Sequence, residues 1–131
     1  MEGDAKVQEY LALSGRYLQA AETLFKEENL EPAMFDAIHA MELAIKAALY
    51  TVSDEDIDTH RVAGLFGKHF REIAGAEFCR DITRGLEKYN LARYPGMDTA
   101  DKDEVEGILA VAVRLIRNVV PDIISKKRAA K

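Results

Sequence analysis

Apolar residues recur every three to four positions along most of this chain, a spacing that gathers them on one face of an α-helix. The pattern is strongest over residues 32–50, PAMFDAIHAMELAIKAALY, where three kinds of side chain follow three different faces. A helix that is apolar around most of its circumference is buried. We therefore expect residues 32–50 to form a central helix with neighbours on at least two sides. The large apolar face comprises Met34, Ile38, Met41, Ile45 and Leu49, the small face Ala33, Ala37, Ala40, Ala44 and Ala47, and the remaining flank Phe35, His39, Glu42 and Lys46.

The same periodicity predicts helices before and after this segment. Residues 4–28 form the first, and Pro32 suits the first turn of the next, so the first two helices should make an antiparallel hairpin. After the acidic loop TVSDEDID, a third helix should be capped by Thr59, a fourth should cover residues 76–94, and a last one should follow the cap Thr99. Pro121 should kink or divide the last helix. No segment alternates with a period of two, so the fold class is all-α.

Length and composition fit one ordinary cytoplasmic domain over residues 1–131. No apolar run reaches the ~18 residues of a membrane span, and the acidic start does not resemble a signal peptide. One cysteine excludes an internal disulfide and fits a reducing compartment. A net charge of -5 argues against coating nucleic acid by charge alone, but leaves room for a local basic patch.

Arg93 is the most informative candidate for a functional residue. On the fourth helix it falls in line with the apolar residues Ile82 and Tyr89. In one interpretation, Arg93 extends its charged head into water from the helix end. In the other, it forms a polar cluster with Glu42 and with His39 or His60.

Other reactive side chains have plainer interpretations. The spacing of His39 and Glu42 suits two metal ligands, but the chain offers no obvious third, so we expect neither metal nor cofactor. His69 should be a partly buried, hydrogen-bonded residue on an apolar helix face. Cys79 should be an inert thiol, because no neighbouring pattern lowers its pKa.

Three sequence segments resemble the HEPN family of small helical domains: DAIHAMELAIKAALY, then His60 before VAGLFGKHF, then NLARYPG. The resemblance implies an up-and-down four-helix bundle with an additional short helix, and a homodimer formed through helix faces. It also implies a minimal nucleotidyltransferase as partner, in a pair that behaves as a toxin and its antidote. Active members are metal-independent ribonucleases, whose motif is an arginine followed after four to six residues by a histidine.

This chain lacks that motif. Arg93 matches the arginine, but Asp98, Thr99 and Ala100 occupy the positions where the histidine should follow. Arg61 and His69 have seven residues between them, one too many. Without a correctly placed imidazole, attack by a ribose hydroxyl lacks its usual proton carrier.

Three hypotheses follow for the function. The first is a non-catalytic subunit that binds the nucleotidyltransferase, a nucleotide or RNA, with no catalytic residue. The second is a degenerate ribonuclease that uses Arg93 with His60 or His69. The third is a purely structural interaction module. The candidate binding residues of the first hypothesis are Arg93, His60, His39, Glu42 and Tyr94.

Overall fold

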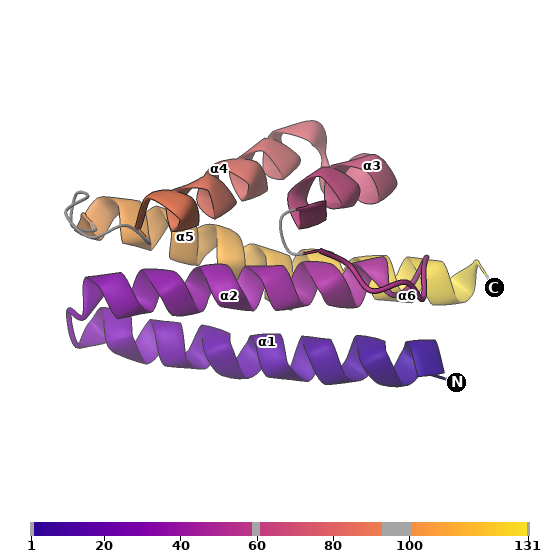
Figure 1. Cartoon of the computed structure of the whole chain (residues 1–131), viewed down its shortest axis with the longest axis horizontal. Helices are drawn as coiled ribbons and strands as arrows, with labels where there is room; N and C mark the ends of the chain where they lie inside the picture. The colour runs from indigo at the N-terminus through magenta and orange to yellow at the C-terminus, as the bar shows by residue number, and fades with distance from the viewer. Residues whose placement is uncertain (1, 59–60, 93–100, 131) are drawn as a thin grey trace.

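The structure is a computed structural model that describes residues 2–58, 61–92 and 101–130 (Figure 1). Over these residues the regular elements are all helical, which confirms the predicted fold class. In Figure 1, α1, α2, α4 and the C-terminal rod alternate in direction, and α3 is a short addition beside α4. The elements are α1 (Glu2–Lys26), α2 (Leu30–Leu49), α3 (Val62–Ala74), α4 (Ala76–Ala92), α5 (Lys102–Arg114), the π-helix η2 (Leu115–Val119) and α6 (Val120–Ala129).

A tight reversal joins α1 to α2 and makes them the predicted antiparallel hairpin. Glu28 takes a positive φ of 62°, and two backbone hydrogen bonds close the turn around it. The N–H of Asn29 donates to the carbonyl of Leu24 at 2.9 Å, and that of Glu28 donates to the carbonyl of Phe25 at 3.0 Å. This pair of bonds is the Schellman ending of a helix. Pro32 lies in the first turn of α2, where its missing N–H costs no helical hydrogen bond.

Helix α2 is the centre of the core, as the sequence predicts. It contacts α1 on one side, α3 and α4 on another, and the rod made by α5, η2 and α6. The large apolar face and the alanine face are both buried; Ile38, Met41 and Ala44, for example, have no exposed surface. Because three groups of neighbours enclose it, α2 determines how the other helices are placed.

The C-terminal rod changes its helical geometry just before Pro121, at the position where the sequence predicts a kink or a division. The proline ring cannot donate a hydrogen bond and would clash with the carbonyl of Arg117 in a regular α-helix. The backbone widens there into the π-helical turn of η2, in which the N–H of Val120 donates to the carbonyl of Leu115. The rod therefore continues past Pro121 as α6, without a break in the helical course of the chain.

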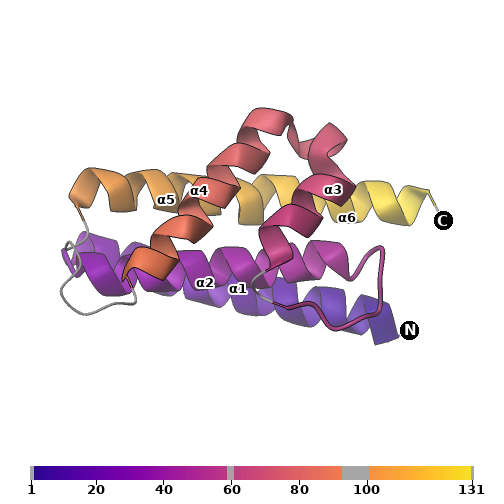
Figure 2. The same cartoon turned by 45° about the horizontal axis from the view of Figure 1, so that its top comes forward.

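Helices α3 and α4 form a second hairpin that lies obliquely across α2 (Figure 2). Gly75 ends α3 with a φ of 91°, which favours glycine, and its N–H donates to the carbonyl of Arg71 at 2.8 Å. Two cations of the rod lie over rings of this hairpin. Arg114 is 4.4 Å from the centroid of Phe78, and Lys127 is 5.8 Å from that of Phe70.

Two details of the sequence interpretation were wrong. The N-caps of α3 and α5 are Arg61 and Asp101, each two residues after the predicted caps Thr59 and Thr99, which lie outside the described residues. His69 is exposed rather than partly buried. The buried residues of α3 recur every four positions, and position 69 lies beside them on the helix surface. These buried residues are Val62, Phe66, Phe70 and Ala74.

Candidate functional site

Most of α2 is enclosed, but its first turn, Asp36 and one narrow face stay at least partly accessible. We call this narrow face the open stripe; it consists of Phe35, His39, Glu42 and Lys46, the residues of the flank that the sequence separates from the two apolar faces. His39 is exposed, and the other three are partly buried. The open stripe borders α1, where His39 contacts Tyr17. It is therefore a part of the core helix that solvent reaches.

His39 occupies the edge of the open stripe next to α1. Its imidazole meets the ring of Tyr17 edge-on, with the ring centroids 4.6 Å apart. Although much of the side chain is exposed, the neighbouring groups that keep water from part of the imidazole lower the pKa of His39 below its usual 6.5, with a smaller opposing effect from Asp36 and a smaller effect in the same direction from Lys46. The imidazole is therefore neutral at pH 7.

The structure brings together two of the five predicted binding residues. His39 and Glu42 lie on the same open stripe, one turn apart. His60, Arg93 and Tyr94 lie outside the described residues, so the polar cluster around Arg93 stays a prediction. Among the described residues, no three histidine, cysteine, aspartate or glutamate side chains meet as metal ligands would.

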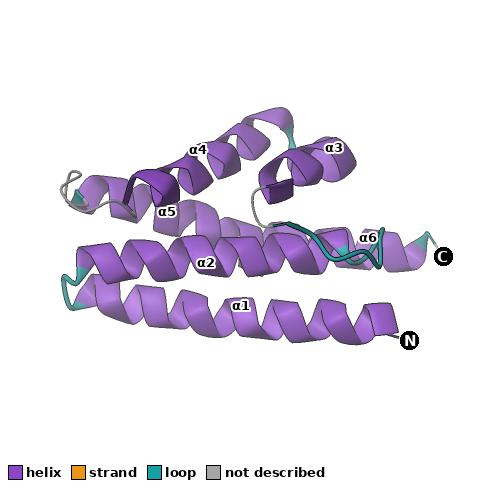
Figure 3. Cartoon of the chain, viewed as in Figure 1, coloured by secondary structure: helices purple, strands orange, loops and turns teal. Residues whose placement is uncertain are grey.

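A polar pocket of about 260 Å³ lies between the segment that follows α2 and the outer face of α3. We call it the loop–α3 pocket; Figure 3 shows its loop as the long teal trace after α2. Helix α3 and its N-cap contribute Arg61, Lys68 and His69, and the loop contributes carboxylates. Apolar side chains complete the wall. The whole lining is Leu49, Val52, Ser53, Glu55, Asp56, Ile57, Asp58, Arg61, Leu65, Lys68 and His69.

Helical spacing explains why these α3 side chains share one wall. Positions 61, 65, 68 and 69 are separated by about one or two turns, so they project from one face of the helix. The sequence interpretation considered Arg61 and His69 together only as a ribonuclease motif with the wrong spacing, and it missed the pocket. The available signal was a basic helix face directly after an acidic loop.

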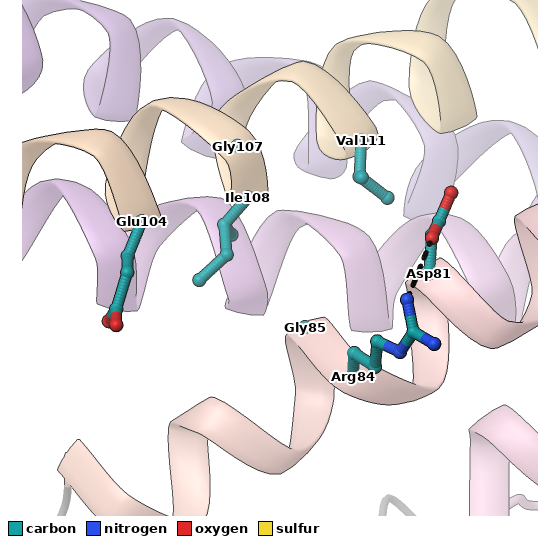
Figure 4. A pocket seen from close by; sticks show the side chains of 7 residues that line it. All are labelled: Asp81, Arg84, Gly85, Glu104, Gly107, Ile108 and Val111. Atoms are coloured by element: carbon teal, nitrogen blue, oxygen red, sulfur yellow. Dashed lines mark ion pairs between the residues drawn. The ribbon is translucent and has the colours of Figure 1, made fainter.

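A second hollow, of about 200 Å³, lies between α4 and α5 (Figure 4). Gly85 and Gly107 leave it open, and Ile108 and Val111 make its wall apolar. At its rim Arg84 pairs with Asp81 at 3.8 Å. The charged residues of its lining lie at the rim, and the lining contains no nucleophile. This hollow therefore offers room for packing and no group for catalysis.

The single cysteine is also unsuited to catalysis. Burial raises the pKa of the Cys79 thiol, and nearby Arg71 opposes this effect only in part. The thiol is therefore protonated at neutral pH and is a weak nucleophile.

Comparison with known proteins agrees with this architecture. The HEPN domain family matches residues 7–123, which includes the open stripe and the loop–α3 pocket. No curated protein matches the chain significantly. Within the described residues, no helix is both long and apolar enough to span a membrane. The family match covers most of the sequence and agrees with the helical fold, and the chain belongs to the HEPN domain family.

Proposed function

We propose that this HEPN domain protein is a non-catalytic binding subunit that holds a nucleotide in the loop–α3 pocket. In this proposal it acts as a cytoplasmic homodimer, with a minimal nucleotidyltransferase as protein partner in a toxin–antitoxin module. The dimer, the partner and the module rest on the family. The nucleotide rests on the pocket, and the single observation that carries it is the placement of Arg61, Lys68 and His69 on one pocket wall.

The two walls of the pocket suit the two ends of a nucleotide. Arginine and lysine donate charge-assisted hydrogen bonds to phosphate oxygens. Glu55, Asp56 and Asp58 on the loop can accept hydrogen bonds from ribose hydroxyls or from amino groups of a base. A volume of about 260 Å³ is at the small end for ligand sites, which favours a mononucleotide over a longer strand.

Calorimetric titration with AMP, ADP, ATP and GTP tests the nucleotide. We expect saturable binding by the native chain and a loss of about tenfold or more in affinity for Lys68→Glu, because a charge-assisted hydrogen bond contributes about 1.5–3 kcal/mol. Arg16→Glu on the outer face of α1 makes the same change of charge away from the pocket and is the matched control. No binding by the native chain, or equal losses in both variants, would overturn the nucleotide proposal.

Co-expression with the product of an adjacent nucleotidyltransferase gene tests the partner. We expect the two chains to elute together through gel filtration in high and low salt. Separate elution at both salt concentrations would remove the partner from the proposal and leave the nucleotide untouched.

A degenerate ribonuclease is the second candidate, because Arg61 and His69 line the same pocket despite their spacing in the sequence. Its test is cleavage of a labelled RNA by purified protein in EDTA. Cleavage that disappears in His69→Ala and persists in His39→Ala would support this candidate over the non-catalytic subunit. Absence of cleavage by the native chain would remove it.

A further inference from the structure

We propose that the loop–α3 pocket selects guanine nucleotides, and that the carboxylate of Asp56 binds the edge of the base. This inference rests on the nucleotide binding of the proposed function, and adds the identity of the base and the residue that selects it. It starts from the uneven distribution of charge in the pocket. The cations of the lining come from α3 and its N-cap, whereas the loop contributes carboxylates and no cation.

The opposite charges of this pocket do not neutralise each other. Within the part of the chain that the structure describes, Arg61 and Lys68 form no ion pair, although Glu55 and Asp56 line the same pocket. A cation without a carboxylate partner can donate to phosphate oxygens, and a carboxylate without a cation can accept from a ligand. The pocket therefore offers separate groups to the two ends of a nucleotide.

Asp56 lies near the end of α2. Burial raises the pKa of Tyr50 most, the neighbouring Tyr10 raises it further, and the charge of Asp56 raises it to a smaller extent. Tyr50 is the C-cap of α2, and the adjacent Leu49 lines the pocket. The acceptor is thus close to the end of α2 while the cations are on α3, so one nucleotide can span the two.

The loop wall presents mainly hydrogen-bond acceptors to a ligand. An ionised carboxylate accepts hydrogen bonds and donates none. The hydroxyl of Ser53 already accepts the N–H of Glu55 at 3.2 Å. The backbone N–H groups of residues 51, 52 and 53 donate to carbonyls of the last turn of α2. The groups that remain on this wall therefore favour a base edge that carries donors.

Guanine is the base whose edge fits such a wall. Its N1–H and its 2-amino group are adjacent donors, which one carboxylate can accept together. Adenine and cytosine each place a ring nitrogen with a lone pair beside the amino group, and uracil places two carbonyl groups beside its single N–H. The carboxylate would face lone pairs in each of these bases, and such a repulsive contact discriminates against the wrong ligand.

Aliphatic side chains provide the apolar part of the pocket. Ligand sites are mostly apolar, with a small number of polar groups that fix the orientation of the ligand. The aliphatic residues would cover the flat faces of the base, and Asp56 would set its orientation. They are Leu49, Val52, Ile57 and Leu65.

Calorimetric titration of the native chain with GMP, IMP and AMP tests the choice of base. We expect GMP to bind at least about tenfold more tightly than AMP, because a hydrogen bond to a charged group contributes about that factor or more. IMP keeps the N1–H of guanine and lacks the 2-amino group, so its affinity should lie between the two. Equal affinities for GMP and AMP would overturn the selection of guanine.

Replacement of Asp56 tests the selecting residue. The amide of Asp56→Asn offers one acceptor and one donor, which match the N1–H and the 2-carbonyl group of xanthine. We expect this variant to bind GMP at least about tenfold more weakly than the native chain does, and to bind XMP more tightly than GMP. Asp54→Asn is the matched control, because Asp54 is an exposed residue of the same loop outside the pocket lining. It should keep the native order of affinities.

Glu55→Gln tests the neighbouring carboxylate by the same exchange of charge for an amide. A preference for XMP in Glu55→Gln, with none in Asp56→Asn, would overturn the assignment to Asp56. Circular dichroism verifies that each variant is folded, so a loss of affinity reports on the pocket.

The outcomes separate this inference from the proposed function. GMP and AMP that bind equally, and that are both weakened by Lys68→Glu, overturn the selection of guanine and leave nucleotide binding intact. Equal losses of GMP affinity in Asp56→Asn and Asp54→Asn overturn the role of Asp56 alone. A native chain that binds none of these nucleotides overturns both the selection of guanine and the nucleotide proposal.

Discussion

The imidazole of His39 and the ring of Tyr17 meet edge-on with centroids 4.6 Å apart, and this contact joins the first helix to the accessible face of the central one. It is a contact between residues 22 positions apart that no local pattern requires. Its consequence is chemical as well as structural. The neighbouring ring removes water from one side of the imidazole, and a charged imidazolium is disfavoured there.

The first prediction is that stability declines in acid through His39. Burial lowers its pKa in the folded chain below 6.5, so the unfolded chain binds this proton first as the pH falls. The free energy of unfolding should therefore decrease as the pH drops below 6.5, until the folded pKa is passed. The exposure of the side chain keeps the effect small.

Urea unfolding between about pH 8 and pH 5.5, on either side of the usual histidine pKa, measures this effect. His39→Gln should flatten the slope relative to the native chain, and His69→Gln is the control. NMR titration should show that Tyr17→Ala raises the pKa of His39. Equal slopes in the native chain and in His39→Gln would contradict the prediction.

The second prediction is that replacing two glycines by alanine has opposite effects. Gly75 has a φ of 91° and a ψ of 143°, a backbone conformation that is strained for any residue with a side chain. Gly75→Ala should therefore lower the free energy of unfolding by about 1–3 kcal/mol. Gly85 lies inside α4, where an added Cβ would be 3.5 Å from Cε of Met41, an ordinary contact. Because alanine favours the helix more than glycine does, Gly85→Ala should raise the free energy of unfolding by up to about 1 kcal/mol.

Urea denaturation of the two variants and the native chain tests both signs in one experiment. Each variant adds one methyl group, so the change in side-chain size is the same. A loss of stability in Gly85→Ala would mean that Met41 cannot accept the added methyl group.

The third prediction concerns the reactivity of Cys79. Burial raises the thiol pKa, and the positive charge of Arg71 opposes this rise. The native thiol should react with a disulfide reagent more slowly than the same thiol in urea at pH 8, because less thiolate is present. Arg71→Glu should slow the reaction further, whereas Arg71→Lys should leave it nearly unchanged. A faster reaction in Arg71→Glu would show that access to the thiol, rather than its pKa, sets the rate.

Helical periodicity predicted the architecture because burial in this fold follows local spacing. The sequence predicted the three faces of residues 32–50, and the flank outside the two apolar faces is the open stripe of the structure. The loop–α3 pocket could not be predicted in the same way. It depends on where the chain places Glu55 and Asp56 after α2, and loop paths have no periodic signal. The predicted burial of His69 was wrong because the buried residues of α3 recur every four positions and include Phe70 instead of its neighbour. The sequence alone does not show which of two adjacent positions on a helix faces the core.

The fourth prediction is a measurable coupling between Glu22 on α1 and Arg117 on η2. The guanidinium donates to both carboxylate oxygens, at 3.3 Å and 2.5 Å, and so connects two elements 95 residues apart. Both side chains are partly exposed, which limits the coupling to about 0.5–1 kcal/mol. The widened turn before Pro121 carries Arg117, so this pair also reports on the π-helical geometry.

A double-mutant cycle with Glu22→Ala and Arg117→Ala measures that coupling from the free energies of unfolding. The pair Asp122 and Lys126, at 3.0 Å within one turn of α6, provides the matched control, with an expected coupling of about 0.3–0.5 kcal/mol. Both couplings should shrink in 1 M salt, where screening acts over about 3 Å. A coupling of zero for Glu22 and Arg117 in low salt, with a normal value for the control pair, would mean that the π-helical turn does not hold Arg117 against α1 in solution.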